Sequence, residues 1–355
     1  MALKVAFLIP GFSDGGAQRQ CVLLLNALQA DPDLDLRLIH FYDGVHFDLL
    51  RHDRLSVQRF DSGSNYDPRK VWRVWRALRR DPPEVLMTWL HACDVYGYAL
   101  HRLMPDMAWV MTERDSAYPN EMRYNLRRKL GRYADVIVAN SVKGAAYWQA
   151  AGATCPIETV PNIVLVGGSE APALPPVPRV VTIGRLEPQK NPRTVVEAFA
   201  MLATEHTALD LAVIGGGAEE PSLKALAAAE GAGERIEFMG FRKDVPDQLA
   251  NSTIVVSMSH NEGLPNVLLE TVAAGRLVVV SDIPEHRELF GPDYPHYVAQ
   301  RTDPSAVAAA VNRALRAPGE ARHLAYARAR LDMMKPEIVA DRYRSIITSV
   351  AEHKK

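Results

Sequence analysis

Short apolar runs alternate with longer amphipathic stretches along most of the chain. The runs are rich in β-branched residues and indicate strands, whereas the stretches between them repeat apolar residues at helical spacing. We expect strands at residues 5–10, 36–42, 84–89, 108–112, 135–140 and 157–161, and again at 179–184, 209–215, 235–240, 253–258 and 276–281. This alternation predicts parallel sheets with helices on both faces, the doubly wound α/β architecture.

The length of 355 residues suits two such domains. The alternation of predicted strands and helices is interrupted over residues 164–178, where glycine and four prolines exclude a regular element. We therefore expect one Rossmann-like domain at 1–163, a linker at 164–178 and a second domain at 179–335. A last helix within 336–355 is expected to pack back across the junction.

Composition excludes several classes of protein. A formal charge of −1 gives no electrostatic reason to bind nucleic acid. Three widely spaced cysteines match no metal-ligand spacing and are typical of reduced thiols in a cytoplasmic protein. No apolar run is long enough for a membrane span, so any bilayer contact is expected to be peripheral, at the inner face of the cytoplasmic membrane.

The segment from Ser259 to Gly275 carries two glutamates eight residues apart, Glu262 and Glu270. Glu262 falls in a loop, and Glu270 falls in a helix that begins near Pro265. The free amides of a helix N-terminus suit phosphate or sugar oxygens. The arrangement predicts a site for a hydroxylated, phosphorylated ligand, although acidic residues also favour first helical turns for electrostatic reasons alone.

Cations and glycines follow other predicted strands. Arg185 and Lys190 lie in the loop after residues 179–184 and suit a diphosphate, or they are solvated loop charges. Three glycines from Gly215 allow close approach of backbone or a tight turn. Gly15 and Gly16 open a helix after the first strand, which is a weak phosphate signal without a Walker lysine.

The order GGAQR, VPNI, GRLEPQKN, IGGG, EFMGF and SHNEGLPNVLLETVAAGRLVVVSDI resembles glycosyltransferase family 4. The resemblance implies the GT-B fold, two Rossmann-like domains facing a central cleft. It implies a retaining transferase, with acceptor-side residues in the first domain and a nucleotide-sugar site in the second. The donor would be a UDP- or GDP-sugar used as a co-substrate, without a further cofactor.

The resemblance also implies individual roles. Arg185 and Lys190 would bind the donor diphosphate, Glu262 the donor sugar and Glu270 the ribose hydroxyls. The residues expected around the donor are Gly184, Gly263, Leu264, Pro265, Asn266, Val267, Phe241 at the base pocket, and Gly15 and Gly16 in a loop that closes over phosphate and acceptor.

The chain departs from the family at the end of residues 108–112. Many relatives place a histidine there, whereas this chain continues with Thr112, Glu113 and Arg114. We expect Arg114 to hold an acceptor anion or the departing phosphate, and Glu113 to orient the acceptor hydroxyl, or both to be helix-cap charges. His91, at an earlier strand end, is another acceptor-side candidate.

In the roles that the resemblance implies, Arg185 and Lys190 would take the place that a metal ion fills in other sugar transferases, so we predict a metal-independent hexosyltransferase. The alternatives are a GT-B nucleotide-sugar epimerase and a non-catalytic nucleotide-sugar-binding subunit. An epimerase would act on the donor alone. A non-catalytic subunit would have lost some of the four charged donor residues, and this chain keeps all of them: Arg185, Lys190, Glu262 and Glu270.

The stretch from Arg69 to Arg80 is a basic amphipathic helix in which Val71, Trp72, Trp75 and Leu78 share one face. Tryptophan beside arginine is typical of a membrane-surface helix, and the same pattern also fits a helix whose tryptophans pack into the core. A second basic stretch begins at Arg123. The membrane interpretation favours a glycan or lipid-linked glycan acceptor, in surface polysaccharide or glycoconjugate synthesis.

Overall fold

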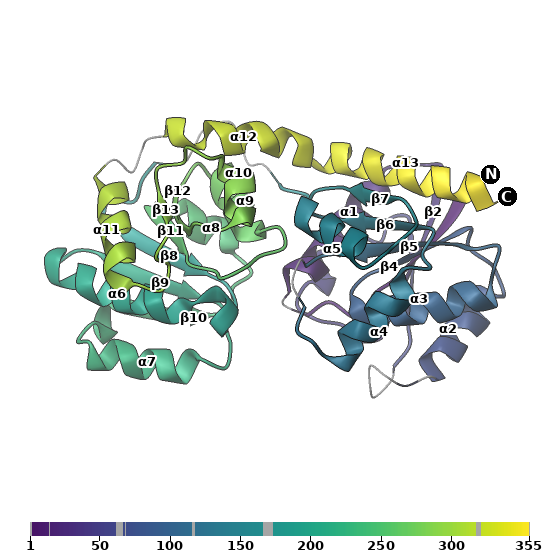
Figure 1. Cartoon of the computed structure of the whole chain (residues 1–355), viewed down its shortest axis with the longest axis horizontal. Coiled ribbons are helices and arrows are strands. Elements are labelled where there is room, and N and C mark those ends of the chain that lie inside the picture. The colour runs from purple at the N-terminus through teal and green to yellow at the C-terminus, as the bar shows by residue number, and fades with distance from the viewer. Residues whose placement is uncertain are drawn as a thin grey trace. The chain divides into compact units, whose positions relative to one another are not determined.

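The computed structural model describes residues 2–13, 15–61, 67, 69–115, 118–165, 173–316 and 321–354. The chain divides into two compact units, shown in Figure 1. Unit 1 comprises Met1–Ile163 and Met334–Lys355, and unit 2 comprises Val164–Met333. Within the predicted linker, residues 166–172 lie outside the described part of the chain.

Unit 1 is built on a parallel sheet that has seven strands in the part the structure describes, in the order β3-β2-β1-β4-β5-β6-β7. The strands are β1 Leu3–Leu8, β2 Leu34–His40, β3 Leu55–Arg59, β4 Val85–Thr88, β5 Ala108–Glu113, β6 Val136–Ala139 and β7 Ile157–Thr159. The strand order reverses between β1 and β4, as in Rossmann-like folds, and ligands bind at such a reversal. The doubly wound prediction is confirmed here.

Both faces of this sheet are covered by helices. They are α1 Gly16–Leu28, α2 Arg69–Leu78, α3 His91–Leu103, α4 Met122–Gly131, α5 Val142–Ala150 and α13 Pro336–Lys354, with the short η1 Phe47–Leu49. Along β1, Val5 and Phe7 pack with α1 and α13, whereas Ala6 and Leu8 pack with α2 and α3. This alternation explains why the strand is apolar and buried from Val5 to Leu8.

The helix α13 belongs to unit 1 although unit 2 precedes it in the sequence. Val339, Tyr343 and Ile347 are buried, and the helix packs along α1 and against β4 and β5 (Figure 1). Their spacing of four residues places them on one face of the helix. The core of unit 1 therefore contains a helix from each end of the chain.

Unit 2 repeats the design with a parallel sheet of six strands within residues 173–316, in the order β10-β9-β8-β11-β12-β13. They are β8 Arg179–Ile183, β9 Asp210–Ile214, β10 Ile236–Gly240, β11 Ile254–Ser257, β12 Leu277–Ser281 and β13 Tyr297–Val298. Its helices are α6 Pro192–Glu205, α7 Glu220–Ala229, α8 Val245–Ala250, α9 Asn266–Ala273, α10 Pro284–Phe290, α11 Pro304–Leu315 and α12 Ala325–Leu331, with η2 Pro188–Lys190, η3 Gly233–Arg235, η4 Ala321–Leu324 and η5 Asp332–Met334.

One face of the second sheet packs against α6, α7 and α11, through side chains such as Val195, Leu223 and Val307. The helix α9 contacts β12 and α12. The strand order reverses between β8 and β11, so the loops that follow these two strands open at the position where doubly wound sheets bind ligands.

The helix α2 differs from its predicted orientation at one residue. Val74 and Leu78 are buried, and Val71 and Trp75 pack against the same cluster. Trp72, expected on that face, is instead 54% exposed among the arginines. The buried face is centred on Val74, and a residue two positions earlier points nearly the opposite way around a helix.

Candidate functional site

The first predicted donor residues lie together after β8. Gly184 follows the strand, Arg185 comes next, and Lys190 ends the short helix η2. The Arg185 side chain is 53% exposed and pairs with Glu187 at 3.0 Å, whereas the Lys190 side chain is only 27% exposed. Two cations thus occupy one loop beside the reversal of strand order.

Lys190 pairs with Glu262, which comes from the loop between β11 and α9. The Lys190 Nζ donates to both Glu262 carboxylate oxygens, at 2.6 and 2.8 Å. Burial by itself raises the pKa of Glu262, but the Lys190 charge and the hydrogen bonds from Lys190 and Ser259 outweigh burial and lower the pKa overall. The carboxylate is therefore ionised at neutral pH, and it neutralises the lysine beside it.

Glycines let the two loops beside this pair touch through their backbones. Gly215 has a φ of 126°, and a Cβ atom there would lie 1.9 Å from the Gly184 carbonyl oxygen. A Cβ on Gly217 would lie 2.4 Å from the Leu186 oxygen, and Leu186 N–H donates to the Gly216 oxygen at 2.9 Å. The glycine run thus brings the loop after β9 against the loop that carries Arg185.

The segment Gly263–Val267 leads into α9, whose first residue is Asn266 and whose N-cap is Pro265. Leu264 lies in the same turn, so the free amides of the helix start are close in sequence to Glu262. Glu270 lies within α9, half-buried. The loop carboxylate and the helix carboxylate therefore come from one continuous segment of unit 2.

Phe241 directly follows Gly240, the last residue of β10, which has a φ of 63°. Its side chain is 40% exposed. It lies at the carboxyl end of the sheet, two strands from β8 in the order of the sheet. This position is compatible with the base-pocket role expected for it, which stays a prediction.

In unit 1, Gly15 is the N-cap of α1 and Gly16 is its first residue. Gly15 has extended backbone angles, with φ −77° and ψ 144°. The preceding residue, 14, lies outside the described part of the chain. The predicted glycine loop therefore does open a helix at the carboxyl end of β1, within unit 1.

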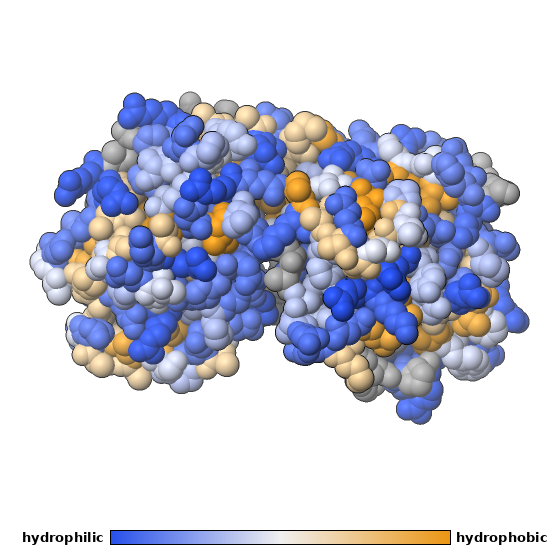
Figure 2. All heavy atoms as spheres, in the orientation of Figure 1, coloured by the Kyte–Doolittle hydropathy of each residue, from blue (hydrophilic) through white to orange (hydrophobic). Residues whose placement is uncertain are grey.

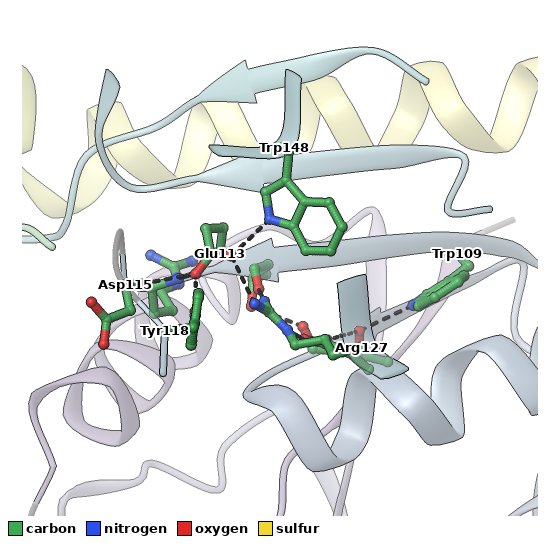
Figure 3. Close-up of polar contacts among 10 residues, drawn as sticks. Trp109, Glu113, Asp115, Tyr118, Arg127 and Trp148 are labelled. Carbon is green, nitrogen blue, oxygen red and sulfur yellow. Dashed lines mark hydrogen bonds and ion pairs between the residues drawn. The ribbon is translucent and has the colours of Figure 1, made fainter. Parts of the chain in front are cut away.

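Glu113 occupies a buried polar network rather than an open acceptor position. Its Oε2 accepts from Arg127 Nη1 at 2.8 Å and from Trp148 Nε1 at 2.7 Å, and its Oε1 accepts from the Asp115 N–H at 2.9 Å. Figure 3 shows these groups converging on the carboxylate, with Tyr118 also hydrogen-bonded to it. Glu113 is 0% exposed.

The expectation that Glu113 orients an acceptor hydroxyl is therefore corrected, because the carboxylate faces the interior of unit 1. Arg127 links it to a second carboxylate, since its Nε donates to Asp94 Oδ2 at 2.6 Å. Trp109 joins the network through Thr88. Buried charges are tolerated only where they are paired and hydrogen-bonded, and this network meets both conditions.

Arg114 lies at the end of β5, with its guanidinium 3.8 Å from the centre of the Trp89 ring. Its Nη1 donates to Asn162 Oδ1 at 3.2 Å, and its Nη2 donates to the Tyr343 hydroxyl of α13. The side chain is partly exposed. Arg114 thus has fixed partners within unit 1, and its acceptor-side role stays a prediction.

His91 is the first residue of α3, after Leu90, whose φ of 71° is unusual for a residue with a side chain. Its ring contacts Tyr124 edge to face, with ring centres 5.3 Å apart. Burial lowers the pKa of His91, and the charges of Arg127 and Arg123 lower it further. The imidazole is therefore neutral near pH 7.

Three buried residues beside the donor loop were not predicted from the sequence. Ser259 donates to Glu262 Oε1 at 2.6 Å, and Glu285 accepts from the Glu262 N–H at 3.4 Å. His286 is 0% exposed, and its Nδ1 lies 2.8 Å from the Ser281 carbonyl oxygen. The only signal available in the sequence was that each follows the carboxyl end of a predicted strand.

Comparison with known proteins is consistent with this geometry. Residues 173–331 match the family model described as "Glycosyl transferases group 1". The lipopolysaccharide core biosynthesis glycosyltransferase LpsE of Rhizobium meliloti is 28% identical over 273 residues, which cover 75% of each chain. An α-1,4-N-acetyl-D-galactosaminyltransferase of Campylobacter jejuni, named for a diphospho-undecaprenol-linked glycan, is 24% identical over 76% of this chain and 77% of its own.

A solved structure of Anabaena HepE in complex with UDP and glucose aligns with a TM-score of 0.84 and 17% identity, covering 98% of this chain and all of that one. Sucrose-phosphate synthase from Thermosynechococcus elongatus aligns with a TM-score of 0.81 and 20% identity, over the same shares. These likenesses show the fold. The solved structures show that the chain has the GT-B fold, and the matched family model with the named relatives shows that it is a glycosyltransferase.

Proposed function

We propose that the chain transfers a hexose from a UDP- or GDP-sugar to a glycan or lipid-linked glycan acceptor, with retention at the anomeric carbon and without a metal ion. The observation that carries the proposal is the pairing of Lys190 with Glu262 beside the reversal of strand order in unit 2. That pair lies within the residues that match the glycosyl transferase model.

Charge supports the assignment of the donor. When the bond between the anomeric carbon and the diphosphate breaks, negative charge develops on phosphate oxygens, and fixed cations stabilise it without reorganising. Arg185 and Lys190 are those cations in the proposal, together with the amides at the start of α9. Each now has a carboxylate partner, Glu187 for Arg185 and Glu262 for Lys190, which the diphosphate would replace or share.

Retention follows if the acceptor oxygen bonds to the anomeric carbon from the face that the diphosphate leaves. Glu262, ionised at neutral pH, would hold the sugar and favour positive character at its ring. Glu270 would hold the ribose hydroxyls, and Phe241 would border the base. The HepE structure was solved with UDP and glucose, which supports testing UDP-sugars first.

The acceptor is proposed from the relatives and from unit 1. LpsE is named for the lipopolysaccharide core, and the Campylobacter jejuni enzyme for an undecaprenol-linked glycan. Gly15, Gly16, His91 and Arg114 lie at the carboxyl ends of unit 1 strands, where an acceptor would be received. The named relatives are transferases, which supports transfer over epimerisation and over a non-catalytic subunit.

A basic face of unit 1 supports peripheral contact with the cytoplasmic face of a membrane. The helices α2 and α4 both pack on α3, and neither contains an acidic residue. Trp72 on α2 and Met122 on α4 are 54% and 86% exposed. Figure 2 shows orange apolar atoms among blue ones over this region. Among the described residues, no helix is long and apolar enough to cross a bilayer.

The proposed function is tested by calorimetry and turnover with a matched pair of variants. We expect wild-type protein to bind UDP or GDP, and Lys190→Ala to bind it at least about tenfold more weakly. Lys224→Ala is the control, because Lys224 also pairs with a glutamate, Glu220 at 2.7 Å, but on the exposed surface of α7. Wild-type protein that binds neither nucleotide at millimolar concentration would refute the proposal.

A further inference from the structure

Two buried serines at the ends of neighbouring strands support the Glu262 carboxylate. Ser259, which is 1% exposed, donates from its Oγ to Glu262 Oε1 at 2.6 Å. Ser281, the last residue of β12, is 0% exposed and donates from its Oγ to the Ser259 carbonyl oxygen at 2.7 Å. The two hydroxyls thus connect β12 to the loop after β11 and to the carboxylate.

His286 extends this support into α10. Its Nδ1 lies 2.8 Å from the Ser281 carbonyl oxygen, an acceptor, so Nδ1 carries the proton. The ring is completely buried, and it fixes the strand end that carries the Ser281 hydroxyl. The connection therefore runs from α10 through Ser281 and Ser259 to Glu262, all within unit 2.

Lys190 holds the same carboxylate in a different way. Its ammonium contacts both Glu262 oxygens, but it stands on a flexible four-carbon stem and its side chain is 27% exposed. Ser259 has a single rotatable bond before its hydroxyl and is enclosed by the core. Lys190 can turn toward another anion, whereas Ser259 has a fixed direction.

We propose that Ser259 is a positioning residue, which keeps the Glu262 carboxylate aimed at the donor sugar when the diphosphate draws the Lys190 ammonium away. This inference rests on the proposed function, because it takes Lys190 as a ligand of the diphosphate. Ser259 itself touches neither substrate nor reacting atoms. Its effect on turnover passes through the orientation of Glu262.

The experiment separates binding of the diphosphate from use of the sugar. UDP and GDP are titrated by calorimetry, because they contain the diphosphate but lack the donor sugar that would be transferred. Release of nucleotide is then measured from UDP-glucose, UDP-galactose, UDP-N-acetylglucosamine and GDP-mannose, and the donor that wild-type protein uses fastest gives kcat and KM. The variants are Ser259→Ala, Ser259→Thr, which keeps the hydroxyl, and Ser252→Ala.

Ser252→Ala is the matched control. Ser252 is 0% exposed in unit 2, and its Oγ donates to the Leu249 carbonyl oxygen at 2.7 Å, so the variant also loses one buried serine hydroxyl. We expect Ser259→Ala to lower kcat about tenfold or more, with nucleotide affinity unchanged and with Ser259→Thr restoring most of the loss. Ser252→Ala is expected to keep the wild-type kcat.

Two results would overturn the inference while leaving the proposed function intact. One is a wild-type kcat for Ser259→Ala in an active enzyme. The other is a loss of nucleotide affinity in Ser259→Ala as large as its loss of kcat, which would indicate general distortion of the loop. Failure of the proposed function looks different, because wild-type protein would then bind no nucleotide and release none from any donor.

Discussion

The Arg127 guanidinium and the Glu113 carboxylate meet 2.8 Å apart in the interior of unit 1, where their side chains are 3% and 0% exposed. The pair ties α4 to the end of β5, and Trp148 adds the support of α5. Because removal of one partner leaves the other charge buried, we expect this contact to matter for stability far more than a surface ion pair.

Glu113→Ala should lower the free energy of unfolding by about 3 to 5 kcal/mol, since Arg127 would lose a buried counter-ion. Urea unfolding followed by tryptophan fluorescence measures the change. The control is Glu197→Ala, which removes the partner of Arg193, a side chain that is 61% exposed on α6, and should cost at most about 1 kcal/mol. Equal losses in the two variants would contradict a structural role for Glu113.

Glu262 and Glu270 should differ in the step that they affect. Glu262→Gln removes a charge next to the sugar and should lower kcat by about 100-fold, with nucleotide affinity nearly unchanged. Glu270→Ala should mainly weaken nucleotide binding. Calorimetry with UDP or GDP and steady-state kinetics distinguish the two effects, and equal nucleotide affinity in wild type and Glu270→Ala would count against this division.

Chelation should leave the enzyme active. If Arg185 and Lys190 stabilise the departing diphosphate, turnover after dialysis against EDTA should stay within about twofold of the untreated value. Arg185→Ala and Lys190→Ala should then each lose activity that added Mg²⁺ or Mn²⁺ does not restore. If EDTA abolished wild-type turnover and added metal restored it, a metal ion rather than these two cations would stabilise the departing diphosphate.

Stability should decrease in mild acid, because four histidines outweigh the buried carboxyl of Asp94, whose pKa burial raises to about 6 and which opposes them. Burial lowers the pKa of His40, His91, His260 and His286 in the folded chain. Unfolded histidines titrate near pH 6.5, so below about pH 6.5 the unfolded chain binds more protons and the folded state loses stability. The loss continues until the pH reaches the lowered folded-state pKa values. Urea midpoints at pH 7.5 and pH 5.5 test this, and an equal or higher midpoint at pH 5.5 would contradict it.

Vesicle binding should depend on the exposed residues of α2 and on Arg79, which directly follows that helix. With anionic phospholipid vesicles at low salt, Arg76→Ala with Arg79→Ala should weaken binding by about 1 kcal/mol for each cation, and Trp72→Ala should weaken it further. Met201→Ala is a suitable control, since Met201 is 45% exposed on α6 of unit 2. The fraction of protein that sediments with the vesicles measures binding. If that fraction is equal for all variants, or does not fall when 0.5 M salt screens the charges, the membrane proposal is wrong.

The fold was largely predictable because parallel strands buried on both faces consist of continuous apolar residues. The strands that escaped prediction lack this property. In β3 the side chains of Ser56 and Arg59 are exposed at the edge of the sheet, and β13 has only two residues, Tyr297 and Val298. Both are marginal strands, whose pairing depends on a neighbour already in place.

The site was less predictable because sequence separates groups that the fold joins. The sequence indicates Lys190 and Glu262 separately, but nothing in it indicates their contact across 72 positions. Glu113 was expected to face substrate, since nothing near it in sequence reveals that Arg127 and Trp148 enclose it. Ser259 is not predicted as a site residue, because an isolated serine gives no sign of the carboxylate that it contacts.

The placement of α13 in unit 1 has a consequence for how the protein forms during synthesis. Unit 2 is a continuous stretch, so it can fold as soon as it emerges from the ribosome. Unit 1 cannot complete its core at that stage, because apolar side chains of α1 stay uncovered until Val339, Tyr343 and Ile347 have been made. Unit 1, most of which is translated first, therefore completes its core last.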